Sequence, residues 1–296
     1  MKILITGANG FLGHYLTGLL LSQEQWVIAT GKGQCRLPFH DHSHFVYEEM
    51  DFTDLRSVRN VLLKHQPDCI VHAGAMSKPD ECELNQELAY RVNVSGTENL
   101  LSVSSALNAF FVFISTDFVF DGKEDSYREE DTPDPVNYYG YTKMLAEQLV
   151  TQYKPLWATV RTVLVYGKPQ TGKQNLLTVV KDKLEKGEPY NVFTDQVRTP
   201  TYVEDLAQGV SAIINKKATG LFHLSGEDVL TPFQMATEVA DCLGLNKSLL
   251  HPVTSAEFAQ PAKRPGRTVL ELEKAKKELD YRPLSFKEGL LKTLAD

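Results

Sequence analysis

A tyrosine and a lysine stand four residues apart in the segment Tyr139-Gly-Tyr-Thr-Lys143. Residues four apart on a helix are surface neighbours, so a helix through this segment would direct the phenol and the ammonium into one site. Free tyrosine has a pKa of about 10, and a nearby cation favours the phenolate. The pair is suited to move a proton to or from an oxygen on a carbon that exchanges a hydride. Because such a pair also arises by chance, its meaning depends on the segments that precede it.

A glycine-rich turn directly follows an apolar strand pattern at the start of the chain. Residues 2–6 are mostly apolar, glycines follow at G-x-x-G-x-x-G spacing, and helical periodicity begins at Phe11. A strand, a glycine turn and a helix in succession favour a phosphate-binding loop, because the backbone can approach a pyrophosphate and the helix N-terminus offers free N–H groups. The residues expected to bind a dinucleotide here are Gly7, Asn9, Gly10, Phe11, Leu12 and Gly13.

Two hydroxyl residues, Ser115 and Thr116, end a second apolar strand pattern that covers 110–114. The carboxyl ends of parallel strands face the crevice in which α/β proteins bind ligands. Neighbouring strand residues point to opposite faces, so only one of the two hydroxyls can face this crevice. We expect Thr116 to hydrogen-bond a substrate carbonyl and hold it toward Tyr139, with Ser115 as the alternative.

Strand and helix patterns alternate along the first part of the chain, which predicts a parallel sheet with helices on both faces. We therefore predict an α/β fold, with a Rossmann-type doubly wound parallel sheet in residues 1–167 and a smaller substrate lobe in 168–296. The expected strands are 2–6, 26–30, 45–50, 68–73, 110–116, 159–166 and, in the smaller lobe, 220–224. The expected helices are 11–23, 54–65, 85–107, 139–153, 173–187, 232–243 and 271–279.

These motifs give the chain a resemblance to the extended short-chain dehydrogenase/reductase superfamily over nearly its whole length. The glycine loop, the Ser115-Thr116 pair and Tyr139-x-x-x-Lys143 carry it. Within the superfamily the likeness is strongest to dTDP-4-dehydrorhamnose reductase, through segments 115–122 and 262–265. The resemblance implies that Thr116, Tyr139 and Lys143 are catalytic and that part of 200–230 returns to the nucleotide-binding domain. Further segments that match the superfamily are 72–75, 93–97, 161–167 and 198–205.

The residues after Thr116 favour one reaction class over another. Nucleotide-sugar dehydratases of the superfamily place Asp-Glu there for water elimination, whereas here Asp117 is followed by Phe118, which cannot act as an acid or base. We expect an NADPH-dependent oxidoreductase that reduces a nucleotide-activated 4-keto-6-deoxy sugar, as in dTDP-rhamnose biosynthesis. A nucleotide-sugar epimerase would use the same groups. A non-catalytic NADP-binding regulatory subunit is the third alternative, because the regulatory subunit of methionine adenosyltransferase resembles the same reductase family.

The end of the second strand bears on the choice of cofactor. NAD-preferring sites usually carry an acid there for the ribose hydroxyls, but here Lys32 and Arg36 follow the strand and no acid does. This favours NADPH and leaves NADH open. Asp51 and Asp54 are both candidates to cap the helix that begins near Leu55. The resemblance adds to the cofactor site, besides Tyr139 and Lys143, the residues Asp51, Phe52, Ala73, Gly74, Ala75 and Asn93.

The substrate site is expected among polar and basic residues near the strand ends and in the C-terminal part. Guanidinium groups fit phosphate oxygens, although each arginine is equally consistent with a surface role. We expect no metal site, because the histidine cluster His40, His42 and His44 is interpreted as a solvated loop. The residues predicted to bind substrate are Ser77, Asp117, Phe118, Arg198 and Arg264, with Arg267 as a further candidate.

Composition limits the partners of this 296-residue chain. The mixture of 42% hydrophobic and 23% charged residues is typical of a globular protein, and the net charge of −7 argues against binding to nucleic acid or to an anionic membrane. The four cysteines lack metal-ligand spacing, and no apolar run approaches membrane-spanning length. We expect a cytoplasmic protein that binds a nucleotide sugar, and a homodimer remains open.

Overall fold

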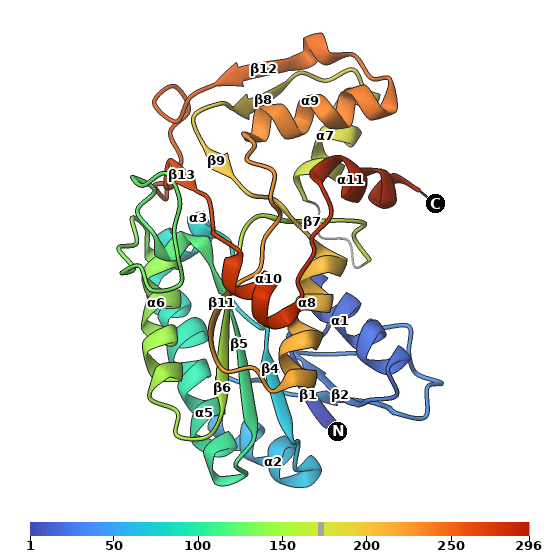
Figure 1. Ribbon diagram of the computed structural model, residues 1–296, viewed down its shortest axis with the longest axis vertical. Coiled ribbons are helices and arrows are strands. Elements are labelled where there is room, and N and C mark those ends of the chain that lie inside the picture. The colour runs from blue at the N-terminus through green and yellow to red at the C-terminus, as the bar shows by residue number, and fades with distance from the viewer. Residues whose placement is uncertain (171–174, 296) are drawn as a thin grey trace.

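A seven-stranded parallel sheet lies at the centre of the larger part of the molecule (Figure 1). The structure is a computed structural model that describes residues 1–170 and 175–295. The strands lie side by side in the order β11-β6-β5-β4-β1-β2-β3, and each neighbouring pair is parallel. They are β1 (Lys2–Thr6), β2 (Trp26–Gly31), β3 (Phe45–Glu49), β4 (Cys69–His72), β5 (Phe110–Thr116), β6 (Trp157–Thr162) and β11 (Gly220–His223).

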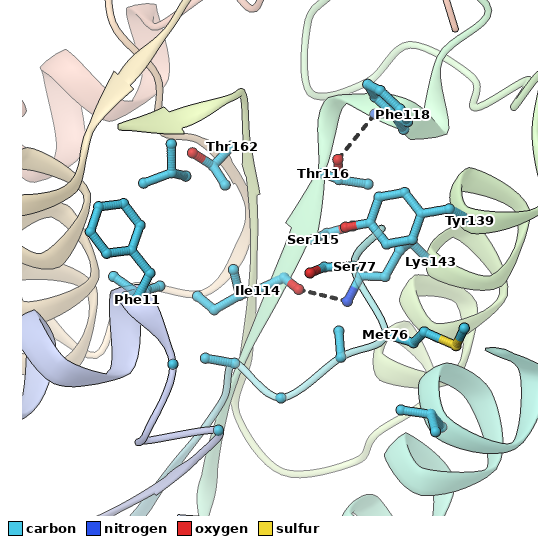
Figure 2. Close-up of a pocket in the computed structure, with 18 of the residues that line it drawn as sticks. Phe11, Met76, Ser77, Ile114, Ser115, Thr116, Phe118, Tyr139, Lys143 and Thr162 are labelled. Atoms are coloured by element: carbon cyan, nitrogen blue, oxygen red, sulfur yellow. Dashed lines mark hydrogen bonds between the residues drawn. The ribbon is translucent and has the colours of Figure 1, made fainter. Parts of the chain in front are cut away.

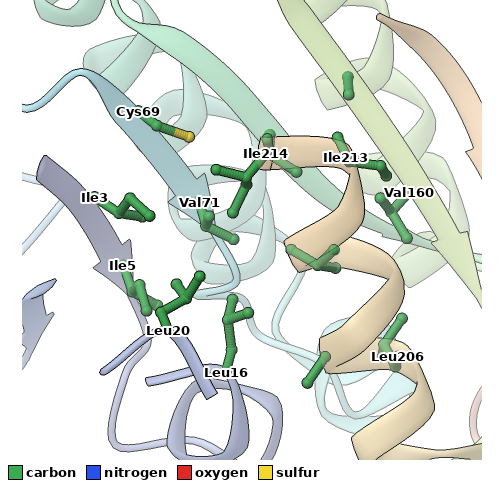
Figure 3. Packing of buried hydrophobic residues seen from close by; sticks show 14 of the residues in the cluster. Ile3, Ile5, Leu16, Leu20, Cys69, Val71, Val160, Leu206, Ile213 and Ile214 are labelled. Atoms are coloured by element: carbon green, nitrogen blue, oxygen red, sulfur yellow. The ribbon is translucent and has the colours of Figure 1, made fainter. Parts of the chain in front are cut away.

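Both faces of this sheet are buried, because alternate residues of its strands belong to two different cores. Ile3 and Ile5 of β1 pack on one side, and Leu4 packs on the other. The first side is covered by α1 (Phe11–Ser22) and α8 (Val203–Lys216), as Figure 3 shows. The other side is covered by α2 (Leu55–His65), α5 (Gly96–Ala106) and α6 (Tyr138–Thr151). The predicted doubly wound, Rossmann-type sheet is therefore confirmed.

The strand order reverses between β1 and β4, which is where α/β sheets open a ligand-binding crevice. The loops that follow these two strands touch. Gly7, after β1, has φ of +68°, and a Cβ atom on it would lie 2.8 Å from Cα of Gly74, after β4. A side chain at Gly7 would thus be strained and would also close the crevice.

The smaller part of the molecule has its own core, at the top of Figure 1. Its helices are α7 (Leu176–Glu185), α9 (Pro232–Leu243) and α11 (Phe286–Leu294), and β8 (Tyr190–Phe193) pairs with β12 (Leu250–Val253). Between its elements the chain runs back through α8, β11 and α10 (Glu273–Leu279), which pack on or join the large sheet. The division at residue 167 remains a prediction, since the chain crosses between the two parts more than once.

Two predicted elements are broken in the structure. The helix expected over 85–107 consists of α4 (Gln86–Tyr90), a π-helical turn η1 (Arg91–Ser95) and α5, and α3 (Pro79–Leu84) precedes it. The strand expected over 159–166 ends at Thr162, because Leu164 turns the chain with φ of +32°. The next strand, β7 (Val165–Tyr166), pairs outside the large sheet with β10 (Thr201–Tyr202). The helix expected from Lys173 begins at Leu176, and Lys173 itself lies outside the described residues.

Candidate active site

A cavity of about 880 Å³ lies along the carboxyl ends of the sheet strands and extends to the smaller part of the molecule (Figure 2). Most of the residues singled out from the sequence meet there. Those that line the cavity are Gly7, Asn9, Gly10, Phe11, Leu12, Lys32, Arg36, Phe52, Ala73, Gly74, Ala75, Ser77, Thr116, Asp117, Phe118, Tyr139, Lys143, Arg198 and Arg264. The predicted residues outside its lining are Gly13, Asp51, Asn93 and Arg267.

The glycine turn presents the N-terminus of α1 to this cavity. The Gly10 N–H donates to the Gly7 carbonyl at 2.8 Å, and α1 starts at the next residue. No side chain caps the helix, and its first turn holds no acid. Gly13 has a packing role instead, since a Cβ atom there would lie 2.5 Å from the Gly7 carbonyl oxygen. An uncapped helix N-terminus beside glycines fits the pyrophosphate of a dinucleotide.

Asn9 braces the loop that follows β2. Its Oδ1 accepts from the Arg36 N–H at 2.8 Å, and its Nδ2 donates to the Gln34 carbonyl and the Tyr47 hydroxyl, both at 3.0 Å. This brace holds the segment that carries Lys32 and Arg36 at the cavity wall. The side chain of Asn9 is thereby engaged within the protein, so its contribution to a cofactor site is to shape this loop.

Asp51 forms an ion pair and does not cap the next helix. Its Oδ2 lies 2.8 Å from Nζ of Lys32, and both side chains are largely or partly exposed. The helix cap is Asp54, whose carboxylate accepts from the Arg56 N–H at 3.0 Å. Its Oδ1 also accepts from the N–H and the hydroxyl of Thr53, at 2.9 and 2.7 Å, so its own turn and Lys32 together orient Asp51, and the pairing with Lys32 could not be read from the sequence.

One face of α6 supplies the phenol and the ammonium, as the i, i+4 spacing predicted. The helix starts at a cap in which Asn137 accepts from the Gly140 N–H at 2.9 Å. The Lys143 ammonium donates to the Ile114 carbonyl at 2.7 Å and lies 3.9 Å from the centre of the Phe113 ring. Figure 2 shows Tyr139 and Lys143 side by side opposite the end of β5.

The choice between the two hydroxyls at the end of β5 is decided by their partners. The Ser115 hydroxyl donates to the buried carboxylate of Glu147. The Thr116 hydroxyl donates to Asp117 at 3.1 Å and reaches the Tyr139 phenol, whose pKa this contact lowers. Thr116 is therefore the hydroxyl next to Tyr139, and Ser115 is tied to the interior.

Burial sets the protonation of both ionisable groups on α6. It raises the pKa of the Tyr139 phenol well above its ordinary value of 10, and the Thr116 hydrogen bond only partly offsets this. Burial likewise lowers the pKa of the Lys143 ammonium to about 7, against the opposing charge of Glu147. The pKa of the Tyr139 phenol thus lies above its ordinary value, against the expectation that the neighbouring Lys143 brings it toward working pH, because desolvation is the largest effect. A phenol that stays protonated is suited to donate a proton.

Asn93 fixes the backbone that borders the site and does not line the cavity. Its Oδ1 accepts from the Met76 N–H at 2.9 Å, and its Nδ2 donates to the Met76 carbonyl at 3.1 Å and to the Thr142 hydroxyl at 3.0 Å. These bonds join the loop after β4 to the catalytic face of α6. The π-helical turn around Asn93 aims its amide at both, and such turns are frequent at functional sites.

The arginine Arg198, predicted to bind a substrate phosphate, is occupied inside the protein. Its guanidinium donates to the carbonyls of Val197 at 2.8 Å and Pro265 at 2.8 Å, and its Nε lies 3.9 Å from Asp117. The side chain is only 3% exposed. Arg198 therefore ties β9 (Val197–Arg198) to Pro265 while it also lines the cavity, and its role as a phosphate ligand stays a prediction.

Arg264 lines the cavity. It forms a two-pronged ion pair with Asp80 at the start of α3, at 2.6 and 2.8 Å, and also donates to the Ala262 carbonyl. Arg267, the further candidate, donates to the Asp125 carbonyl instead. Among the predicted arginines, Arg264 thus lies at the cavity and has a carboxylate partner, Asp80. An anionic ligand could compete with that carboxylate for the guanidinium.

Several lining residues were not foreseen. Thr30 and Thr162 are hydroxyls at the carboxyl ends of strands, the same signal that identified Thr116, and could have been found in that way. The others, apart from Gln196, are apolar residues or glycine and carry no such signal. They are Gly31, Met50, Pro79, Val92, Ile114, Leu164, Val165, Gln196 and Leu206, and Ser115, expected as the alternative to Thr116, and Met76, next to the expected Ser77, line the cavity as well.

Over residues 1–170 and 175–295, no three His, Cys, Asp or Glu side chains gather in a metal-binding group. In the same part of the chain, none of the helices combines the length and the apolar character needed to cross a membrane.

Comparison with known proteins identifies relatives along the whole chain. The profile described as RmlD substrate binding domain matches residues 1–296. Methionine adenosyltransferase 2 subunit beta of Bos taurus is 32% identical over 91% of this chain and 80% of its own. The spore coat polysaccharide biosynthesis protein SpsK of Bacillus subtilis is 32% identical over 100% of this chain and 97% of its own. The dTDP-4-dehydrorhamnose reductase of Bacillus anthracis, solved in complex with NADP, has a TM-score of 0.87 at 28% identity, covering 99% of this chain and 98% of that one.

Proposed function

Because this chain belongs to the RmlD substrate binding domain family of the extended short-chain dehydrogenases/reductases, we propose that it is an NADPH-dependent reductase of a nucleotide-activated 4-keto-6-deoxy sugar. One observation carries the proposal. Thr116, Tyr139 and Lys143 line the same cavity as the glycine turn, so a proton donor and a cofactor-binding loop share one space.

The three side chains have separate roles in this reaction. Thr116 would hydrogen-bond the ketone oxygen, and the buried Tyr139 phenol would give its proton to that oxygen as the alkoxide forms. Lys143 would hold the cofactor ribose and stabilise the resulting phenolate. A reduced nicotinamide, when bound, supplies the hydride. Asn93 keeps the Met76 loop and α6 in place around these groups.

The preference for NADPH follows from the charge at the far end of the cavity. Lys32 and Arg36 line it there, and a guanidinium and an ammonium suit the additional phosphate of NADP. The solved reductase of Bacillus anthracis in complex with NADP supports the same choice. Asp51 reduces this preference only in part, because its carboxylate is paired with Lys32.

Turnover with a defined substrate tests the proposal. Purified protein mixed with NADPH and dTDP-4-keto-6-deoxy-L-mannose should oxidise the cofactor, followed at the nicotinamide absorbance. Tyr139→Phe removes the proton donor and retains the ring, so we expect a loss of kcat of about 100-fold or more with nearly unchanged NADPH affinity. Tyr141→Phe, two residues further along α6 and exposed, is the matched control and should retain activity. Equal turnover in Tyr139→Phe and the unsubstituted protein would remove Tyr139 from the mechanism.

A non-catalytic regulatory role is the second candidate, and one observation favours it. The relative named methionine adenosyltransferase 2 subunit beta is as similar in identity, 32%, as SpsK is. In this role the cavity would bind NADP without turnover, and the chain would act through a partner enzyme. Binding of NADPH without turnover on any keto sugar, together with a stable complex with a methionine adenosyltransferase catalytic subunit, would support this candidate over the reductase.

A further inference from the structure

We infer that Glu147 is a positioning residue of this site, whose anchored carboxylate maintains the charged form of Lys143 and accepts the hydrogen bond of the Ser115 hydroxyl. The inference deepens the proposed reductase function and rests on that function for its effect on turnover. Its effect on Lys143 can be measured without any substrate.

Glu147 continues the catalytic face of α6. Tyr139, Lys143 and Glu147 follow one another at intervals of four residues, so they lie on one side of the helix, with Cβ atoms roughly 5–6 Å apart. All three side chains are buried, at 9%, 2% and 5% exposure. Glu147 therefore stands one turn beyond Lys143 on the face that contacts the sheet.

The carboxylate of Glu147 is held from two strands. The Ser115 hydroxyl of β5 donates to its Oε1, and the Arg161 guanidinium of β6 donates to Oε1 at 3.1 Å and to Oε2 at 2.7 Å. The carboxylate and the guanidinium are 6% and 3% exposed. Three donors converge on this carboxylate and fix it in position.

Lys143 needs a nearby negative charge more than a surface lysine does. Its ammonium contacts a backbone carbonyl and the Phe113 ring, and none of the ion pairs within 4.0 Å in the described chain includes it. Burial lowers its pKa to about 7, and the charge of Glu147 is the first effect that opposes this. Without Glu147, a larger fraction of Lys143 would be neutral at physiological pH.

The surrounding groups do not replace Glu147. Burial lowers the pKa of the His72 imidazole and raises that of the Cys82 thiol to about 11, so both are neutral near pH 7. Arg161 is cationic and already paired. From α4, η1 and α5 the neutral or apolar Ala89, Asn93 and Leu100 face this region. The titratable groups that face this stretch of α6 from other elements are His72 of β4, Cys82 of α3, Asp117 of η2 (Asp117–Val119) and Arg161 of β6.

The anchor also separates the two hydroxyls at the end of β5. The Ser115 hydroxyl donates to Glu147, and the neighbouring Thr116 is the hydroxyl that reaches Tyr139. One carboxylate thereby engages Ser115 and stands one helical turn from Lys143.

The direct test is the titration of Lys143. In protein with ¹³C-labelled lysine, the Lys143 Cε resonance is assigned by its absence from Lys143→Arg and followed from about pH 4.5 to about pH 10. Glu147→Gln combined with Arg161→Met removes both buried charges, so neither is left unpaired. We expect its Lys143 midpoint to fall by about one pH unit. Glu98→Gln, an exposed glutamate on α5, is the control for charge alone and should leave the midpoint unchanged.

A second variant tests the direction in which the Lys143 midpoint changes. Arg161→Met alone leaves the Glu147 carboxylate unopposed and should raise the Lys143 midpoint. An unchanged midpoint in the folded double variant, verified by circular dichroism, overturns the inference. If turnover is established, the same double variant should move the alkaline decline of kcat/KM to lower pH. If turnover is absent, the titration still decides the role of Glu147, so the two proposals fail independently.

Discussion

Lys143 is a charged group kept in a place that disfavours its charge. The ammonium is 2% exposed, and burial brings its pKa from 10.5 to about 7. The folded protein therefore carries a cost at neutral pH that an apolar side chain would not impose. Such a cost is expected where a residue serves chemistry and not stability.

Replacing this lysine should stabilise the protein while abolishing its function. Between pH 7 and about 10.4 the unfolded chain holds the Lys143 proton and the folded chain releases it, so the stability of the unsubstituted protein rises with pH in this window. Lys143→Met should be more stable by roughly 1–3 kcal/mol at pH 7, and its advantage should shrink toward pH 10. Urea unfolding at both pH values measures this. Lys154→Met, at an exposed site, should show no such trend, and a destabilised Lys143→Met would contradict the argument.

Lys32 and Arg36 allow a test of cofactor preference at the same scale. Lys32→Ala combined with Arg36→Ala removes both cations at the end of the cavity, so NADPH affinity should fall by about 10-fold or more while NADH affinity changes little. Fluorescence titration with each cofactor gives the two dissociation constants. Lys168→Ala, an exposed lysine outside the cavity lining, is the matched control. Equal losses for NADPH and NADH would show that these residues do not select the cofactor.

At the scale of elements, close contact between β1 and α1 depends on Gly13. A Cβ atom at this position would lie 2.5 Å from the Gly7 carbonyl oxygen and 2.6 Å from Cα of Ala8, both in the backbone. Backbone cannot move aside as a flexible side chain does, so the phosphate-binding turn itself would have to shift. Gly13 thus serves the contact between strand and helix, and it does not line the cavity.

Gly13→Ala should therefore destabilise the fold and weaken the cofactor site together. We expect a loss of about 1–3 kcal/mol in unfolding free energy and a weaker affinity for NADPH. Gly18→Ala in the same helix is the control, because its Cβ atom would meet only the movable Phe39 side chain, at 3.1 Å, and alanine favours helices. Similar effects of the two substitutions on NADPH binding would refute the role assigned to the turn.

The broken elements show where local pattern stops being informative. The apolar periodicity of 85–107 is that of one helix, yet the Asn93 amide bonds the Met76 backbone and Thr142, and the chain widens into a π-helical turn there. Those partners come from 17 and 49 residues away. Periodicity records which side of a segment is buried, and it contains no information about such distant bonds.

At the scale of the whole molecule, the ion pair between Asp80 and Arg264 joins the two parts beside the cavity. Asp80 belongs to the nucleotide-binding part, and Arg264 belongs to the segment that leads out of the smaller part. The hydrogen bonds from Arg264 hold the pKa of the Asp80 carboxyl below its usual value. A carboxyl with a depressed pKa adds stability above its unfolded pKa near 4 and loses it as pH falls further.

Asp80→Asn should consequently lower stability by about 1 kcal/mol at pH 7, discounted for the partial exposure of the pair. The difference from the unsubstituted protein should vanish as pH falls from about 4 to about 2, which urea unfolding across this range would reveal. Glu81→Gln is the neighbouring control, because its pair with Lys78 is more exposed, at 52% and 70%. A difference that persists at acid pH would mean that the Asp80 charge is not the stabilising element.

The amino-acid sequence alone determined the family, the parallel sheet, the glycine turn and the residues Thr116, Tyr139 and Lys143. These features are encoded in residues near one another, since a strand, a turn and a helical repeat each have a local pattern. Only the tertiary structure decided that Ser115 donates to Glu147, that Asp51 pairs with Lys32 and that Arg198 donates to the Pro265 carbonyl. Burial and pairing depend on groups distant in sequence, so the direction of the Tyr139 and Lys143 pKa shifts also emerged only once the chain was folded.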